Sequence, residues 1–84
     1  MKHATPASLD RLEDVLAKLR AFDTLKEKSR GVFYQRGKAA LHFHEDPAGL
    51  FADLRVDGEW RRFRVDDPPG HDALLAAIDG GLAR

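Results

Sequence analysis

Two histidines one residue apart, His42 and His44, are the first side chains in the sequence whose types and spacing could do chemistry. Alternate residues of a β-strand point to the same side, so both imidazoles would lie on one face of a strand. An imidazole can bind a transition metal or act as a general base near neutral pH. Together with Asp53, on the next predicted strand, the pair suggests either a metal site or a hydrolytic site.

The metal site is incomplete as the sequence presents it. Zinc takes three or four protein ligands, and His42, His44 and Asp53 supply at most three. A fourth would have to come from residues with no characteristic spacing: Glu45, Asp46 or His71. The chain has no cysteine, so a thiolate cannot complete the set. We therefore expect no bound metal and no other cofactor.

A hydrolytic site would use His42 as general base, oriented by Asp53, with an arginine to stabilise an anion. The sequence offers no clear nucleophile for it, because Ser8 and Ser29 lie outside the main predicted strands. A flat sheet in a chain of 84 residues also forms a substrate pocket with difficulty. These points argue against an enzyme.

The strands that position these residues are predicted from a hairpin signal. Asp57-Gly58 is typical of a two-residue type I′ turn, which pairs Val56 with Glu59 and Asp53 with Arg62. Period-two alternation then separates two faces, since a slip of one residue would exchange them. The apolar face carries Leu41, Phe43, Leu50, Ala52, Leu54, Phe63 and Val65. The opposite face carries His42, His44, Phe51, Asp53, Arg55, Trp60, Arg62 and Arg64.

The second face has two interpretations. Charged pairs across strands are common on solvated sheet faces and contribute roughly 0.2–1 kcal/mol each. Two large aromatics among arginines, Phe51 and Trp60, are more typical of an interface. We therefore predict a small non-catalytic binding module that uses this face for a protein partner or a second copy of the chain.

Nucleic acid is the alternative partner for the same face. Trp60 and Phe51 could stack on bases while Arg55, Arg62 and Arg64 contact phosphates. The whole chain, however, has fourteen basic and fourteen acidic residues and no net charge, whereas a nucleic-acid binder normally carries a basic excess. We rank this alternative below a protein partner.

Within the polar face, the predicted register places His42, Asp53 and Arg62 in a row across three strands. The hypothesis from this row is that Asp53 bridges His42 and Arg62. A carboxylate beside an imidazole favours its protonated form, so the pKa of His42 is expected to rise.

Helices are predicted on both sides of the strands. Thr5-Pro6 is typical of a helix start, residues 1–4 are expected to fray, and the helix should end near Phe22. Its apolar residues recur at steps of three and four: Leu9, Leu12, Leu16 and Leu19. A second helix follows the prolines at 68–69, with apolar positions at Leu74, Leu75, Ile78 and Leu82.

The elements together predict an α+β fold: a helix, a four-stranded antiparallel meander and a second helix, with both helices packed on one sheet face. The expected strands begin with Val32 to Tyr34, and a loop is expected over 45–49. The polar segment 23–30 is expected either to add a short helical turn or to lead directly to the sheet. The length suits one domain, residues 1–84.

Localisation follows from what the sequence offers a membrane. The longest apolar stretches fall well short of the ~20 residues that span a bilayer. Met1 is followed by Lys2 and His3 and then by no apolar run, so we expect no secretory signal. We expect a cytoplasmic protein that does not bind membranes.

The stretch GVFYQRGKAALHFHEDPAGLFADLR, followed by GEWRRFRV, resembles a type of small bacterial protein. In that type a His-x-His strand, an acidic loop and an Ala-Asp-Leu strand occur in this order. The resemblance covers about half of the 84 residues. It implies a small bacterial α+β domain without an assigned activity, and it implies no catalytic or binding residue.

Overall fold

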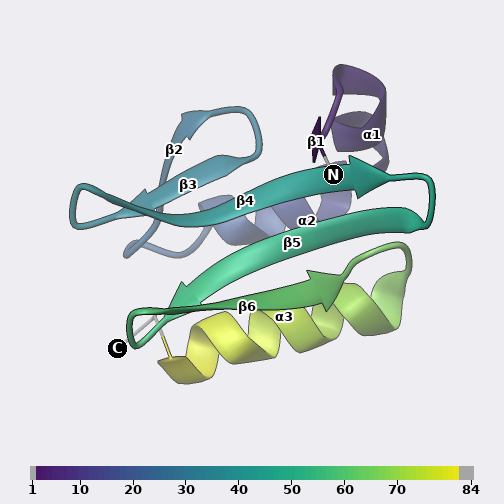
Figure 1. The fold of residues 1–84 in the computed structure, drawn as a ribbon. Helices are drawn as coiled ribbons and strands as arrows, with labels where there is room; N and C mark the ends of the chain where they lie inside the picture. Colours follow the sequence, from purple (N-terminus) through teal and green to yellow (C-terminus); the bar gives the residue numbers. More distant parts are fainter. Residues whose placement is uncertain (1, 82–84) are drawn as a thin grey trace.

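The computed structural model describes residues 2–81. These residues form one antiparallel sheet of six strands with three helices (Figure 1). The strands are β1 (Lys2–His3), β2 (Lys26–Ser29), β3 (Val32–Gln35), β4 (Lys38–Asp46), β5 (Gly49–Val56) and β6 (Glu59–Arg64). The helices are α1 (Pro6–Arg11), α2 (Glu13–Arg20) and α3 (Pro68–Gly81). The α+β class is confirmed, and the prediction of four strands is wrong.

The first additional strand, β1, lies where the chain was expected to fray. The sheet has the order β2-β3-β4-β5-β6, and β1 pairs with the end of β4, with His3 opposite His44. Its neighbours are tied to β4 as well. The backbone N–H of Ala4 donates to the carbonyl of Phe43 at 3.1 Å. The N–H of Thr5 donates to the Glu45 carboxylate at 2.6 Å. Backbone pairing therefore orders a segment that buries little apolar surface.

The second additional strand, β2, falls in the segment that was expected to form a helical turn or a connection, so neither expectation includes it. Its sequence, Lys-Glu-Lys-Ser, has no apolar residue, so no alternation announces a strand. It forms because its backbone pairs with β3 at the sheet edge, with Lys26 opposite Tyr34. Strand formation here depends on the neighbouring strand more than on local composition.

The turns hold the register that the sequence predicts. Asp57 and Gly58 both have positive φ, 53° and 81°, as a type I′ turn requires. Val56 pairs with Glu59 and Asp53 with Arg62, as expected. The loop predicted over 45–49 is shorter than expected, because β4 continues to Asp46 and β5 begins at Gly49.

The predicted first helix is interrupted. It begins at Pro6, and Thr5 caps it by accepting a hydrogen bond from the Ser8 N–H at 3.4 Å. At Leu12 the backbone leaves helical geometry (φ −98°, ψ 4°), which divides the segment into α1 and α2. The predicted second helix corresponds to α3. Its predicted apolar position Leu82 lies outside the described residues.

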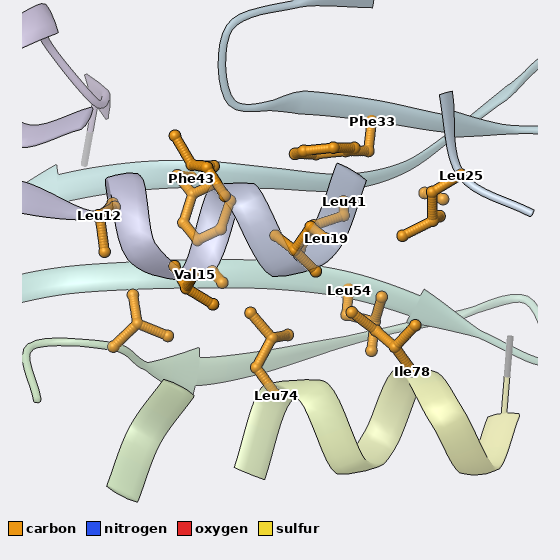
Figure 2. Close-up of a cluster of buried hydrophobic side chains, with 14 of the residues drawn as sticks. Leu12, Val15, Leu19, Leu25, Phe33, Leu41, Phe43, Leu54, Leu74 and Ile78 are labelled. Atoms are coloured by element: carbon orange, nitrogen blue, oxygen red, sulfur yellow. The ribbon is translucent and has the colours of Figure 1, made fainter. Parts of the chain in front are cut away.

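The core lies between one sheet face and two helices. Figure 1 shows α2 behind β4 and β5, and α3 alongside β6. In Figure 2, side chains from both helices point toward those of the sheet, so both helices cover the same face. The fully buried members of this core include Leu12, Val15, Leu16, Leu19, Phe33, Leu41, Phe43, Leu54, Val65, Leu74 and Ile78. Phe63, on the edge strand β6, is only partly buried.

Within residues 2–81, no helix is both long and apolar enough to cross a membrane.

Candidate functional site

The polar face predicted from the sequence lies opposite the helices. We call it the open face and define it by His42, His44, Phe51, Asp53, Arg55, Trp60, Arg62 and Arg64. The pairing of β4 with β5 and of β5 with β6 places these residues in adjacent rows, including His42 opposite Asp53 and Arg55 opposite Trp60. Among the described residues, Trp60 is the only large hydrophobic side chain that is exposed, at 49%.

At one end of the open face, three histidines come together. Because β1 pairs with β4, His3 lies opposite His44. His42 lies two residues before His44 on the same strand. The ring centroids of His3 and His44 are 5.2 Å apart, and those of His42 and His44 are 4.6 Å apart. One possible ligand atom from each lies within 4.8 Å of the other two. We call His3, His42 and His44 the histidine cluster.

His44 has the most polar side-chain contacts of the three histidines. Its Nε2 lies 2.6 Å from Nδ1 of His42 and 3.2 Å from Oδ2 of Asp53. Both contacts involve the same nitrogen, so a proton on Nε2 can be donated either to the Asp53 carboxylate or to the His42 imidazole. Nδ1 of His44 is buried and has no hydrogen-bond partner among the described residues.

The hypothesis that Asp53 bridges His42 and Arg62 is wrong in one of its two contacts. Asp53 accepts two hydrogen bonds from Arg62, from Nε at 2.8 Å and from Nη2 at 3.0 Å. Its other contact is with His44, although His42 is its backbone partner. Side chains can lean along a strand, so a diagonal contact replaces the directly opposed one. The Arg62 hydrogen bonds lower the pKa of Asp53, which therefore stays ionised.

The expected rise in the pKa of His42 is also wrong. Burial lowers the pKa of His42, and the nearby His44 lowers it further, which outweighs the opposing effect of Asp53. Burial likewise lowers the pKa of His44, although Asp53 opposes the shift. At pH 7 both imidazoles are therefore neutral, with one ring nitrogen each available as a lone-pair donor.

The arginines and aromatics of the open face are stacked on one another. The guanidinium of Arg55 lies over the Trp60 ring at 5.7 Å, and that of Arg64 lies over Phe51 at 5.8 Å. The Trp60 ring also meets His42 edge-on, with centroids 5.0 Å apart. These contacts hold a half-exposed indole between two neighbours.

Two of the three arginines already have carboxylate partners. Arg62 is held by Asp53, as described above. Arg64 donates from Nε to the Asp66 carboxylate and from Nη2 to the carbonyl of Ala48. Arg55 therefore carries the positive charge of this face that is most available to a ligand.

Comparison with known proteins adds no assignment: no family model, curated protein or solved structure matches the chain. The resemblance noted in the sequence therefore stays an expectation.

The structure brings together all eight residues of the predicted face and adds His3. His3 was not among the predicted site residues, because residues 1–4 were expected to fray. Nothing in the local sequence indicates its position, since Lys2-His3 has no hydrophobic alternation. Only the pairing with β4 places it.

Proposed function

We propose that this protein is a small non-catalytic binding module whose open face docks the acidic surface of a partner protein. The observation that carries the proposal is Trp60, half exposed and held between His42 and Arg55. Tryptophan and arginine are enriched among the residues that dominate binding energy at interfaces. An aromatic that is already positioned also loses little side-chain entropy when it is buried by a partner.

The charge of the open face indicates the partner. Three arginines, Arg55, Arg62 and Arg64, stand against two carboxylates, Asp53 and Asp66, and the unpaired Arg55 leaves the patch positive. His42 and His44 are neutral at pH 7. Two copies related by a twofold axis would bring the same positive patch face to face, which costs free energy. A partner with acidic side chains complements this patch, so we favour it over a homodimer.

The partner class follows from how the arginines are engaged. Arg62 and Arg64 each bind a carboxylate already, which reduces the positive charge that they can offer to a row of phosphates. The chain also has no net charge. Both points favour a protein over a nucleic acid, whose binding depends on many phosphate contacts. The open face has no hydroxyl or thiol nucleophile, so the proposed function is binding without catalysis.

The test uses Trp60 fluorescence as the signal, with poly-L-glutamate as a protein-like acidic probe and single-stranded DNA as the competing one. We expect poly-L-glutamate to bind more tightly than DNA, and Arg55→Glu to remove the binding. Arg61→Glu is the matched control, since Arg61 lies next to Trp60 but stacks on Phe63, a residue of the other face. Both variants change the charge by the same amount on the same sheet.

Three results would contradict the proposal. Tighter, strongly salt-dependent binding of DNA would favour the nucleic-acid alternative. A dimer in light scattering that dissociates on Trp60→Ala would show that a second copy occupies the face. Equal loss of binding in Arg55→Glu and Arg61→Glu would show that only net charge matters and that the open face is not the binding surface.

A further inference from the structure

We propose that His3, His42 and His44 bind a single divalent transition metal, with zinc as the best fit. This inference goes beyond docking and does not depend on it. Three imidazoles are a common ligand set for zinc, with the fourth position left to water. From the sequence we expected no metal, because only His42, His44 and Asp53 could be placed together and the possible fourth ligands Glu45, Asp46 and His71 had no characteristic spacing. The third histidine becomes available through the pairing of β1 with β4.

The distances are close to what a zinc site needs. Ligand nitrogens at about 2.0–2.1 Å from zinc in a tetrahedron lie roughly 3.4 Å from one another. Here the ligand atoms lie within 4.8 Å of one another, and the closest pair, Nδ1 of His42 and Nε2 of His44, is 2.6 Å apart. Ring adjustments of about 1 Å would bring all three to one metal.

The backbone that carries the cluster is well anchored. His42 and His44 lie in the middle of the sheet, on β4, which pairs with β5 on one side and with β3 and β1 on the other. His3 is held by its pairing with His44 and by the two hydrogen bonds that follow it, from Ala4 to Phe43 and from Thr5 to Glu45. Sites built on paired strands are positioned more precisely than sites on loops.

The surroundings of the cluster suit a cation. Asp53 lies 3.2 Å from His44 Nε2, so its carboxylate would lie close to a metal bound at that nitrogen and offset part of its charge. Arg62 holds Asp53 in place by donating two hydrogen bonds to its carboxylate.

The ligand type decides which metals fit. Three imidazole nitrogens are suited to zinc, copper or nickel, whereas magnesium and calcium prefer oxygen ligands. We therefore expect binding of Zn²⁺ and no measurable binding of Mg²⁺ at the same concentration. Co²⁺, as a spectroscopic substitute for zinc, should give the visible absorption of a four-coordinate site.

The experiment is calorimetric titration of the untagged, metal-free chain with ZnCl₂. We expect one zinc per chain, and a loss of affinity on the order of 100-fold or more for His3→Ala, His42→Ala and His44→Ala, since even an outer-shell partner costs roughly 10–100-fold. His3→Ala is the most informative variant, because His3 is exposed on a two-residue strand and its removal leaves the core intact.

The matched control is His71→Gln, which alters the one remaining histidine. His71 lies in α3, and its Nε2 contacts the carbonyl of Val65 at 2.9 Å, outside the cluster. We expect this variant to bind zinc as the unchanged chain does. Circular dichroism of each variant confirms that a loss of binding is not a loss of fold.

Several outcomes would overturn the proposal. Titration of the unchanged chain that gives no heat of zinc binding and no change in its histidine ring NMR signals would exclude a metal site. Zinc affinity that survives His3→Ala would exclude the three-histidine set. One zinc per two chains would place the site between copies rather than within one chain. Loss of binding only in His71→Gln would locate the metal elsewhere.

Discussion

His3 lies directly opposite His44 across the β1–β4 pair, and the two imidazole rings stack at an interplanar angle of 27°. This contact joins residues 41 positions apart and turns a His-x-His pair into a cluster of three. It depends on the short strand β1, so the stability of β1 controls whether the cluster exists.

Glu45 should control the docking of β1. Its carboxylate accepts a hydrogen bond from the Thr5 N–H. This bond, together with hydrogen bonds from the Thr5 and Ser8 side chains, lowers the pKa of Glu45 to about 2. Glu45→Gln keeps the shape of the side chain but removes its charge. We expect faster hydrogen exchange at the amides of Ala4 and Thr5, and weaker zinc binding, while amides in β5 and β6 are unchanged. Exchange that stays unchanged at residues 4 and 5 would show that Glu45 does not hold β1.

Glu27 should make the fold sensitive to acid. Hydrogen bonds from Arg20 to Glu27, the shorter at 2.6 Å, lower the pKa of Glu27, and the Gly31 N–H adds a contact at 2.9 Å. Because the folded pKa is below the unfolded one, this stabilisation is complete above the ordinary glutamate pKa, about 4.3, and is lost as the pH falls through the folded value. Glu13 also contacts Arg20, and its negative charge opposes the shift by raising the pKa of Glu27.

Urea unfolding of Glu27→Gln measures that contribution. We expect a loss of about 1 kcal/mol at pH 7, reduced by solvent screening because the pair lies near the surface. The difference from the unchanged chain should shrink below about pH 4. A difference that persists undiminished at pH 2 would mean that charge is not its cause. Lys38→Gln, which replaces an exposed lysine at the start of β4, serves as the control.

Leu74 should be essential for holding α3 on the sheet. Its side chain is fully buried in the core, whereas that of the adjacent Leu75 is only partly buried. Leu74→Ala should lower the free energy of unfolding by about 2–5 kcal/mol, through lost burial and the cavity left behind. Leu75→Ala, the same chemical change one residue away, should cost clearly less. Chemical denaturation measures both, and equal losses would mean that α3 is not oriented as described.

Two glycines should respond oppositely to the same substitution. Gly58 has a φ of 81°, which an L-residue adopts at a cost of roughly 1–2 kcal/mol. Gly80 lies in α3, and a Cβ there meets nothing within 4 Å. We therefore expect Gly58→Ala to destabilise the fold and Gly80→Ala to stabilise it by up to about 1 kcal/mol. Thermal unfolding distinguishes them, and a gain for Gly58→Ala would contradict the turn type.

The sequence determined the central part of this protein. Asp57-Gly58 permits one turn type, and the strict alternation around it allows only one register, because any slip would put Leu54 in water and Arg55 in the core. The two faces of the sheet follow from that register, as do the helices that must cover the apolar face. Local chemistry was sufficient there because each choice agreed with its neighbours.

Only the tertiary structure decided the rest. Strands β1 and β2 have no apolar periodicity, so their order comes from backbone hydrogen bonds to other strands: β1 pairs with β4, far along the chain, and β2 pairs with the adjacent β3. The contact of Asp53 with His44 depends on how side chains lean within the packed face, which a register does not specify. For the same reason the pKa of His42 falls where the sequence suggested a rise, since burial is a property of the folded surroundings.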